Sequence, residues 1–439
     1  MNASHKLFAR ALQLLSVGAL VLLASPAKSQ AQFLFVDCSG MNPYAYPSIT
    51  AALPNAGPGA FVLVTGVCNE SVSLWGQTGL NIGAFYGQTA TINGNFSINN
   101  SQNIFLYGLI VTNSPRDGIS VGSSRGIILD TCSSSGNAGL GLAVNSMSDV
   151  AIQASGTFDN NGRGGISEAE SSQVRVWAWA GLVDISNNGG PGIWASQGSF
   201  WTYGHTTIAN NTFGAGSNSG YGFDLRGAAR AQVGTVFGPN FITGNQQGGA
   251  WLQENSEISF WNAGYTTTIQ GNGPVGVLAG FGSQVTFFSS SLITGHSSAG
   301  VDLYASSQAY LFGANTVQGN GSSTDVRSAG IRVDGNSEAF LRGGQVSGNI
   351  GPGMLVLVNS SADFSGVSFS GNSGVISCDS SSTMVSDLAV SHSTPAAGVS
   401  CRTPHALGGR QITKTQPVVP EWSAYKAQHD RYAKLAVKH

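Results

Sequence analysis

Hydrophobic and polar residues alternate with period two over short stretches along most of the chain. In "GVDLYASSQAYLFG" (300–313), Val301, Leu303, Ala309 and Leu311 fall on one side, and polar or aromatic residues fall between them. This period predicts short strands with one buried face. Strands of this length cannot bury that face alone, so the pattern predicts that neighbouring stretches stack on one another.

The stretches recur at intervals of 23 to 30 residues, which indicates a repeat architecture. Each opens with a glycine followed by an apolar residue, at Gly118, Gly141, Gly165, Gly192, Gly222, Gly249, Gly276, Gly300, Gly330 and Gly353. An amide precedes most of these glycines, as in "IQGN" (269–272) and "VQGN" (317–320). In "ITGH" (293–296) a histidine takes the place of the amide.

Stacking such units predicts parallel strands about 4.8 Å apart around a continuous apolar bore. Amides at equivalent turns would then lie above one another and hydrogen-bond along the stack. The predicted column contains Asn161, Asn188, Asn245, Asn272, Asn320, Asn349 and Asn372. Glycine would supply the positive φ angles that these turns need.

This repeat resembles the right-handed parallel β-helix of the pectin-lyase-like superfamily over about residues 33–400. "VDCSGMNPYAYPSITAALPNAGPGAFVLVTGVCNESVSL" (36–74) is similar to the N-terminal segment in which a short helix caps the bore. The expected fold is therefore all-β, a right-handed single-stranded parallel β-helix with an N-terminal cap and a C-terminal helical tail. The expected parts are a signal peptide (1–31), a cap (32–72), about twelve coils (73–401) and a basic linker with a tail helix (402–439).

Charged residues make up only 9% of the chain, and the formal net charge is −2. No lysine occurs between Lys28 and Lys414, so the composition argues against nucleic acid as a partner. Basic residues precede an apolar run from Leu12 to Ala24, and small residues follow it, as in a secretory signal. We therefore expect a secreted or periplasmic protein without a transmembrane segment in the mature chain, because the run is short for a bilayer span of about 20 residues.

An exported chain can form disulfides, and five cysteines are present. Cys38 with Cys68, and Cys378 with Cys401, would each close one end of the mature domain, leaving Cys132 as a small buried residue. No Cys-x-x-Cys or paired histidine spacing occurs, so no metal site and no cofactor are predicted.

The catalytic motifs of superfamily enzymes are absent from the sequence. Asp117-Gly118 is all that the chain shares with the Asn-Thr-Asp motif of polygalacturonases, and Gly204-His205 and Gly295-His296 each lack the glycine that completes Gly-His-Gly. The resemblance therefore implies the fold without implying an inherited activity.

The position two residues after each repeat glycine predicts an outward column of Ser167, Trp194, Asp224, Trp251, Leu278, Asp302, Arg332 and Leu355. Trp194 and Trp251 would lie two coils apart, about 10 Å, with Asp224 between them. Aromatic faces beside a carboxylate suit a sugar. A second outward column would contain Trp177, Trp201, Tyr203, Trp261, Phe288, Tyr310 and Phe312. Alternatively, outer aromatic rings stack only on one another or lie under a tail.

A catalytic version of the site uses Asp302 and Asp334, which would lie about 8 Å apart on adjacent coils, a separation suited to inverting glycosidases. Arg332 between them would keep both acids ionised, whereas a general acid needs a raised pKa. The alternative is a surface ion pair. Glu168 and Glu170 are interpreted as solvated charges on a turn.

From Trp422 onward, aromatic and apolar residues recur at helical spacing with Lys and Arg between them. This tail is expected to dock over the open end or the flank of the solenoid, with tethering to an anionic surface as the alternative. The leading functional hypothesis is non-catalytic recognition or adhesion at a polysaccharide or cell-surface matrix. The alternatives are an atypical polysaccharide lyase or glycoside hydrolase and a purely structural surface protein. The sequence does not predict the oligomeric state.

Overall fold

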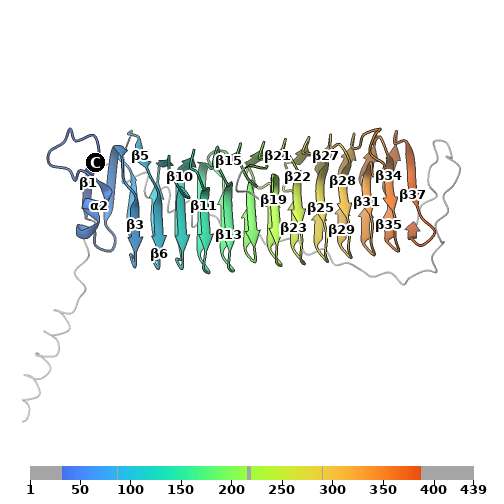
Figure 1. The fold of residues 1–439 in the computed structure, drawn as a ribbon, viewed down its shortest axis with the longest axis horizontal. Helices are drawn as coiled ribbons and strands as arrows, with labels where there is room; N and C mark the ends of the chain where they lie inside the picture. Colours follow the sequence, from blue (N-terminus) through green and yellow to red (C-terminus); the bar gives the residue numbers. More distant parts are fainter. Residues whose placement is uncertain (1–31, 87, 215–218, 289, 387–439) are drawn as a thin grey trace, which may run out of the picture.

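The computed structural model describes residues 32–86, 88–214, 219–288 and 290–386. Over these residues the chain forms a right-handed parallel β-solenoid of about 14 turns, against about twelve expected (Figure 1). The predicted signal peptide (1–31) and the tail (402–439) lie outside the described residues. Within the described part, no helix is long and apolar enough to cross a bilayer.

Sheet I is one face of the solenoid and holds 13 of the described strands, all parallel to their neighbours. Its strands are β3 (Val72–Trp75), β6 (Phe96–Asn99), β9 (Ile119–Gly122), β11 (Leu140–Asn145), β13 (Gly164–Ala169), β16 (Ile193–Ser196), β19 (Tyr221–Arg226), β22 (Gly248–Leu252), β25 (Val275–Ala279), β28 (Ala299–Leu303), β31 (Ala329–Val333), β34 (Pro352–Val356) and β37 (Gly374–Cys378).

Sheet II holds 25 of the described strands and supplies two strands to most coils. The first row is β4 (Asn81–Ala84), β7 (Phe105–Tyr107), β14 (Gln173–Trp177), β17 (Ser199–Thr202), β20 (Arg230–Gly234), β23 (Glu257–Trp261), β26 (Gln284–Phe287), β29 (Gln308–Phe312), β32 (Glu338–Arg342), β35 (Ser361–Ser365) and β38 (Thr383–Ser386). The second row is β5 (Ala90–Asn93), β8 (Leu109–Thr112), β15 (Val183–Ser186), β18 (Thr206–Ala209), β21 (Asn240–Thr243), β24 (Thr267–Gln270), β27 (Ser291–Thr294), β30 (Thr316–Gln318), β33 (Gln345–Ser347) and β36 (Ser368–Ser370). Three longer strands run through both rows, namely β2 (Phe61–Cys68), β10 (Ile127–Ser135) and β12 (Asp149–Thr157), and β1 (Phe33–Asp37) pairs with β2.

The bore is filled by the side chains that the period-two pattern assigned to the inside. Val277 of β25 lies in register with Val301 of β28, which lies in register with Ile331 of β31. All three are fully buried. The rings of Phe260 and Phe287 stack inside the bore with centroids 4.7 Å apart. The alternation therefore continues from coil to coil as a single apolar column.

An asparagine ladder runs along the turn that precedes sheet I, as predicted. Asn245 Nδ2 donates to Asn272 Oδ1 at 2.8 Å and to the Ile208 carbonyl at 3.0 Å. The backbone N–H of Asn245 also donates to Asn272 Oδ1, at 3.0 Å. Such bonds satisfy the polar groups of a turn that is shielded from water. The ladder also includes two residues missing from the prediction, Asn137 and Asn211.

Two kinds of glycine serve this turn. Gly271, just before the ladder residue, adopts a φ of 57°, the left-handed region that a glycine enters at low cost. Gly249, which opens its strand, is needed for close packing, because a Cβ there would lie 2.5 Å from the Gly276 carbonyl oxygen. The glycine that opens each strand is thus needed for the contact between coils, and the glycine before the ladder amide is needed for the turn.

The N-terminal cap consists of α2 (Ile49–Ala52) and the 3-10 helix η1 (Leu53–Asn55), which cover the end of the bore. Ser48 caps α2 by accepting from the backbone N–H of Ala51. The Glu70 carboxylate accepts the N–H groups of Ile49 at 2.7 Å and Thr50 at 3.0 Å. Hydrogen bonds from the cap thus reach the segment that enters the first coil.

Glu168 corrects one sequence interpretation. It lies in register with Val144 on one side and Ala195 on the other, both of which face the bore, and it is fully buried. The period-two alternation from Ile166 onward continues through this position. The glutamate therefore belongs to the apolar bore and is not a solvated charge on a turn.

Candidate functional site

The outward column of sheet I is aligned as predicted. Trp194 of β16 pairs in register with Asp224 of β19, and Asp224 pairs with Trp251 of β22. Farther along, Asp302 of β28 pairs with Arg332 of β31. Because side chains two positions apart share a face of a strand, Arg226, Tyr304 and Asp334 join the same outer face. Tyr221 joins it through a ring contact with Trp251.

Trp251 contacts an aromatic ring and a cation, both of which come from β19. The Tyr221 ring centroid is 5.2 Å from that of Trp251, with the planes tilted by 33°. The Arg226 guanidinium carbon lies 5.0 Å from the centroid of the Trp251 ring. Half-buried Trp251 also holds a buried indole N–H, Nε1, that has no hydrogen-bond partner among the described residues. These contacts fix the orientation of the indole.

Asp224 holds Arg226 in place. Its two carboxylate oxygens each accept from the guanidinium at 2.8 Å, from Nε and from Nη2. The Asp224 side chain is only 2% exposed, while that of Arg226 is 28% exposed. This hydrogen bonding raises the pKa of Arg226. The carboxylate therefore positions the arginine over Trp251, whereas the sequence suggested that it would face a sugar directly.

Asp302, Arg332 and Asp334 form an ion triad. Arg332 Nη1 donates to Asp302 Oδ2 at 3.2 Å, and Arg332 Nη2 donates to Asp334 Oδ2. Asp302 Oδ1 is buried and has no hydrogen-bond partner among the described residues. The structure thus brings the three predicted residues together, with the guanidinium between the carboxylates.

Burial raises the pKa of Asp302 to about 6, and the positive charge of Arg332 only partly opposes this shift. The desolvation of the Asp302 carboxylate thus outweighs the attraction of Arg332, which was expected to favour its ionised form. The loop before β31 contributes to this environment. Its Arg327 lies close enough to act on the Asp302 charge, and its Asp325 accepts a hydrogen bond from the side chain of Ser298, next to β28.

Tyr221 and Tyr304 connect the two halves of this face. The Tyr304 ring lies over Gly280, where an added Cβ would come within 2.1 Å of the ring. Burial, followed by the charge of Asp224, raises the pKa of Tyr221 to about 12, so its hydroxyl remains a hydrogen-bond donor at neutral pH. Neither Tyr221 nor Arg226 was predicted as a site residue from the sequence. The period-two rule could have found Arg226, which lies two positions from Asp224, but not Tyr221, which lies three positions from it and joins the face through its ring contact with Trp251. We call Trp194, Tyr221, Asp224, Arg226, Trp251, Asp302, Tyr304, Arg332 and Asp334 the tryptophan–arginine face.

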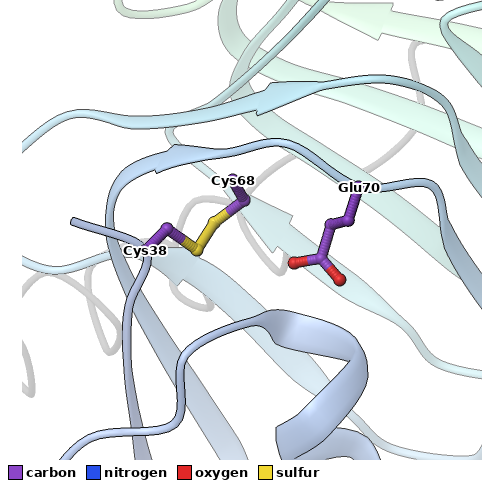
Figure 2. Close-up of side chains that lie close together, drawn as sticks. All are labelled: Cys38, Cys68 and Glu70. Carbon is purple, nitrogen blue, oxygen red and sulfur yellow. A yellow bond between two sulfur atoms is a disulfide. The ribbon is translucent and has the colours of Figure 1, made fainter. Parts of the chain in front are cut away.

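A second group of potential ligands lies at the N-terminal cap, where Figure 2 shows Cys38, Cys68 and Glu70 side by side. Their ligand atoms lie within 4.8 Å of one another. The two sulfurs form the predicted disulfide, which links positions 30 residues apart. The Glu70 carboxylate is already occupied by α2. This group therefore fits a covalent closure of the cap better than a metal site.

The remaining cysteines agree with the expectation where they can be compared. Cys378 is disulfide-bonded, and its predicted partner, Cys401, lies outside the described residues. Cys132 is a free thiol inside the bore, and burial raises its pKa to about 12. A thiol in this environment is unreactive.

A match to a protein-family model agrees with the architecture. Residues 94–263 match the family model described as the right handed beta helix region. No curated protein matches the chain.

Among solved structures, the pectate lyase Pel9A is 13% identical, with 80% of this chain and 79% of that chain covered and a TM-score of 0.35. The A-module of the mannuronan C-5 epimerase AlgE6 of Azotobacter vinelandii is 16% identical, with 77% and 93% covered and a TM-score of 0.41. A family 28 exopolygalacturonase of Yersinia enterocolitica is 12% identical, with 82% and 79% covered and a TM-score of 0.29.

Proposed function

We propose that the chain is an exported protein whose tryptophan–arginine face binds carbohydrate without cleaving it. The observation that carries this proposal is that contacts with Tyr221 and Arg226 of the neighbouring strand hold Trp251 in one orientation. A sugar can stack its C–H face on an aromatic ring while its hydroxyls accept from nearby donors. The disulfide between Cys38 and Cys68 supports export, because structural disulfides persist in oxidising compartments.

The face is preorganised, which lowers the entropic cost of binding. Its side chains project from strands whose neighbours are paired on both sides, and the charges that orient them are paired as well. Binding would therefore require little ordering of side chains. The Tyr221 hydroxyl, which stays protonated at neutral pH, is a donor for a ligand hydroxyl on this face.

The charges on this face favour a neutral sugar over a uronic acid. The guanidinium of Arg226 is bonded to both oxygens of Asp224, and that of Arg332 is shared between Asp302 and Asp334. A uronate carboxylate would have to displace one of these acids, and it would then face the carboxylate that it displaced. A neutral hexose chain carries no such penalty.

The test is retention of the purified protein on a panel of neutral and acidic polysaccharides. Trp251→Ala should weaken binding to the preferred neutral polymer by about 2 kcal/mol, roughly 30-fold in Kd, as for a central aromatic contact. Trp75→Ala is the matched control, because Trp75 is also an outward tryptophan of sheet I but lies on β3, far along the solenoid. Equal binding by both variants, or preference for uronate polymers that survives Trp251→Ala, would contradict the proposal.

A second candidate function is glycoside cleavage, because the pKa of Asp302 is raised to about 6 and its buried Oδ1 has no hydrogen-bond partner among the described residues. A protonated Asp302 could donate to a glycosidic oxygen, with Asp334 activating a water molecule. The Arg332 guanidinium, however, fills the space between the carboxylates that this water would need. The same polymer panel decides between the functions: release of reducing ends that is lost in Asp302→Asn would establish cleavage, whereas retention without release supports binding.

A further inference from the structure

Apolar side chains gather on the outside of the solenoid, on the first row of sheet II. In β14, Val174 and Val176 point into the bore, so the alternation directs Trp177 outward. We call this group the lateral cluster, whose buried members are Phe105, Ile128, Ala151, Trp177, Tyr203 and Trp261. The Trp177 and Tyr203 rings stack with centroids 4.3 Å apart, and Trp261 meets the Tyr203 ring edge-on at 6.0 Å.

These outward positions are buried, unlike comparable positions elsewhere. Trp177 is 0% exposed and Tyr203 is 2% exposed, whereas the outward Trp75 of sheet I is 70% exposed. Polar neighbours on the same row are buried as well, since Asp130 and Gln153 are each 0% exposed. Burial therefore extends beyond ring-on-ring stacking and includes the polar rim of the cluster.

The amide of Gln153 shows that water does not reach this flank. Gln153 lies in register between Asp130 and Trp177, on the outer side of β12. Neither its Nε2 nor its Oε1 has a hydrogen-bond partner in the described structure. On a solvated outer face, water would bond to both atoms at no cost. A dry outer face on a parallel solenoid requires a covering segment.

We propose that the C-terminal segment, residues 422–439, docks on the lateral cluster. It carries Trp422, Tyr425, Tyr432 and Leu435 at the spacing of one helical face, which matches an apolar surface lined by aromatic rings. Its four basic residues, Lys426, Arg431, Lys434 and Lys438, suit the acidic Asp130 at the rim of the cluster. The occupant is thus part of the same chain.

The connecting segment is long enough for this docking. From β14 to β38 the first row of sheet II makes eight inter-strand steps, which amounts to about 40 Å. Residues 387–421 lie between β38 and the docking segment. At about 3.3 Å per extended residue they can span on the order of 100 Å. The return path therefore needs no strained linker.

The distribution of lysines provides a direct test. The chain contains lysine only at positions 6, 28, 414, 426, 434 and 438. An amine-reactive photo-crosslinker on the full-length protein therefore labels the tail and the N-terminal end. After irradiation and digestion, we expect insertions from Lys426 and Lys434 into peptides of β7, β10, β12, β14 or β17. Insertions confined to other strands would overturn the proposal.

Isotope labelling identifies which copy supplies the tail. In an equal mixture of ¹⁵N-labelled and unlabelled chains, docking within one chain gives crosslinks in which both peptides are labelled or both are unlabelled. Mixed crosslinks would show that a second copy is the occupant, which would also overturn the proposal.

A pair of variants completes the experiment. The double substitution Tyr425→Ser and Tyr432→Ser should abolish the insertions into the lateral cluster and increase acrylamide quenching of tryptophan fluorescence. Ala427→Ser, on the opposite helical face, should change neither measurement. Retention of the insertions in the tyrosine variant would show that the tail does not bind through its aromatic face.

Discussion

Glu168 places a carboxyl group inside the apolar bore, between Val144 and Ala195. Both of its oxygens lack a hydrogen-bond partner within the described residues. Burial raises the pKa of Glu168 well above 4.5. The side chain is therefore protonated in the folded protein over a pH range in which the unfolded chain has lost the proton.

This difference makes folding pH-dependent. Below pH 4.5 both states are protonated, and Glu168 does not change the free energy of unfolding with pH. As the pH rises toward the higher folded pKa, the unfolded state releases its proton first, and stability falls by up to about 1.4 kcal/mol per pH unit. We expect Glu168→Gln to remove this fall. The variant should resemble the parent near pH 4 and should be more stable at pH 7.

The measurement is denaturant unfolding of parent and variant between pH 4 and pH 8. Glu254→Gln is the matched control, because Glu254 is exposed on a turn after sheet I. Its unfolding curve should follow that of the parent at every pH. A difference between Glu168→Gln and the parent that does not grow with pH would show that the carboxyl is ionised in the folded state.

At the scale of structural elements, the asparagine ladder is broken at one coil. His296 replaces the amide, and its Nε2 contacts the Ile269 carbonyl at 3.1 Å, as a ladder amide would. Its Nδ1 faces the Asn272 carbonyl at 2.9 Å, so a neutral ring directs a lone pair at an oxygen in one of the two contacts. A doubly protonated ring would satisfy both, but burial lowers the pKa of His296 from its ordinary 6.5.

We expect His296→Asn to complete the ladder and raise the free energy of unfolding by about 1 kcal/mol at neutral pH. The gain should grow below pH 6.5, because the unfolded parent then binds a proton that the buried ring does not. Thermal unfolding at pH 5 and pH 7.5 measures both effects. Asn320→His is the converse control and should destabilise the next coil. A His296→Asn variant less stable than the parent would show that packing of the imidazole ring outweighs the mismatch.

The repeat was predictable from the sequence because each element is short, periodic and similar to the next. The side chains that fill the bore, the turn glycines and most ladder residues could be predicted from the period-two alternation and from the spacing of the repeats alone. Asn211 was missed because the loop between β18 and β19 is longer than in neighbouring coils. The environments of Asp302 and Trp177 were not predictable, because the covering of an outward position depends on loops and segments distant in sequence. The bore position of Glu168, by contrast, follows from the alternation that begins at Ile166.

The candidate site was likewise predictable only in part from the sequence. Spacing predicted that Trp194, Asp224 and Trp251 align, and the register agrees. Spacing could not predict that Asp224 would pair with Arg226 on its own strand, since side-chain rotamers decide that contact. The fold of a solenoid can therefore be predicted from its sequence, but the contacts of its functional side chains have to be taken from the structure.

At the scale of the whole molecule, each coil contacts chiefly the coils beside it, as the strand pairings show. Stability in such a molecule is approximately a sum of local terms, so a change at one end is not transmitted far. The N-terminal cap is the clearest place to examine this property. There the Cys38–Cys68 disulfide joins the end of β2 to the segment that follows β1.

We expect the double substitution Cys38→Ser and Cys68→Ser to reduce the stability of the cap by about 3–4 kcal/mol, the loop-entropy value for a crosslink of this length. In native-state hydrogen exchange, amides of β1 and β2 should lose protection, whereas those of β33 and β36, near the other end of the stack, should keep theirs. Adding reductant to the parent should reproduce the effect. Uniform loss of protection along the stack would show that the coils unfold as one cooperative unit and that the cap holds the entire solenoid together.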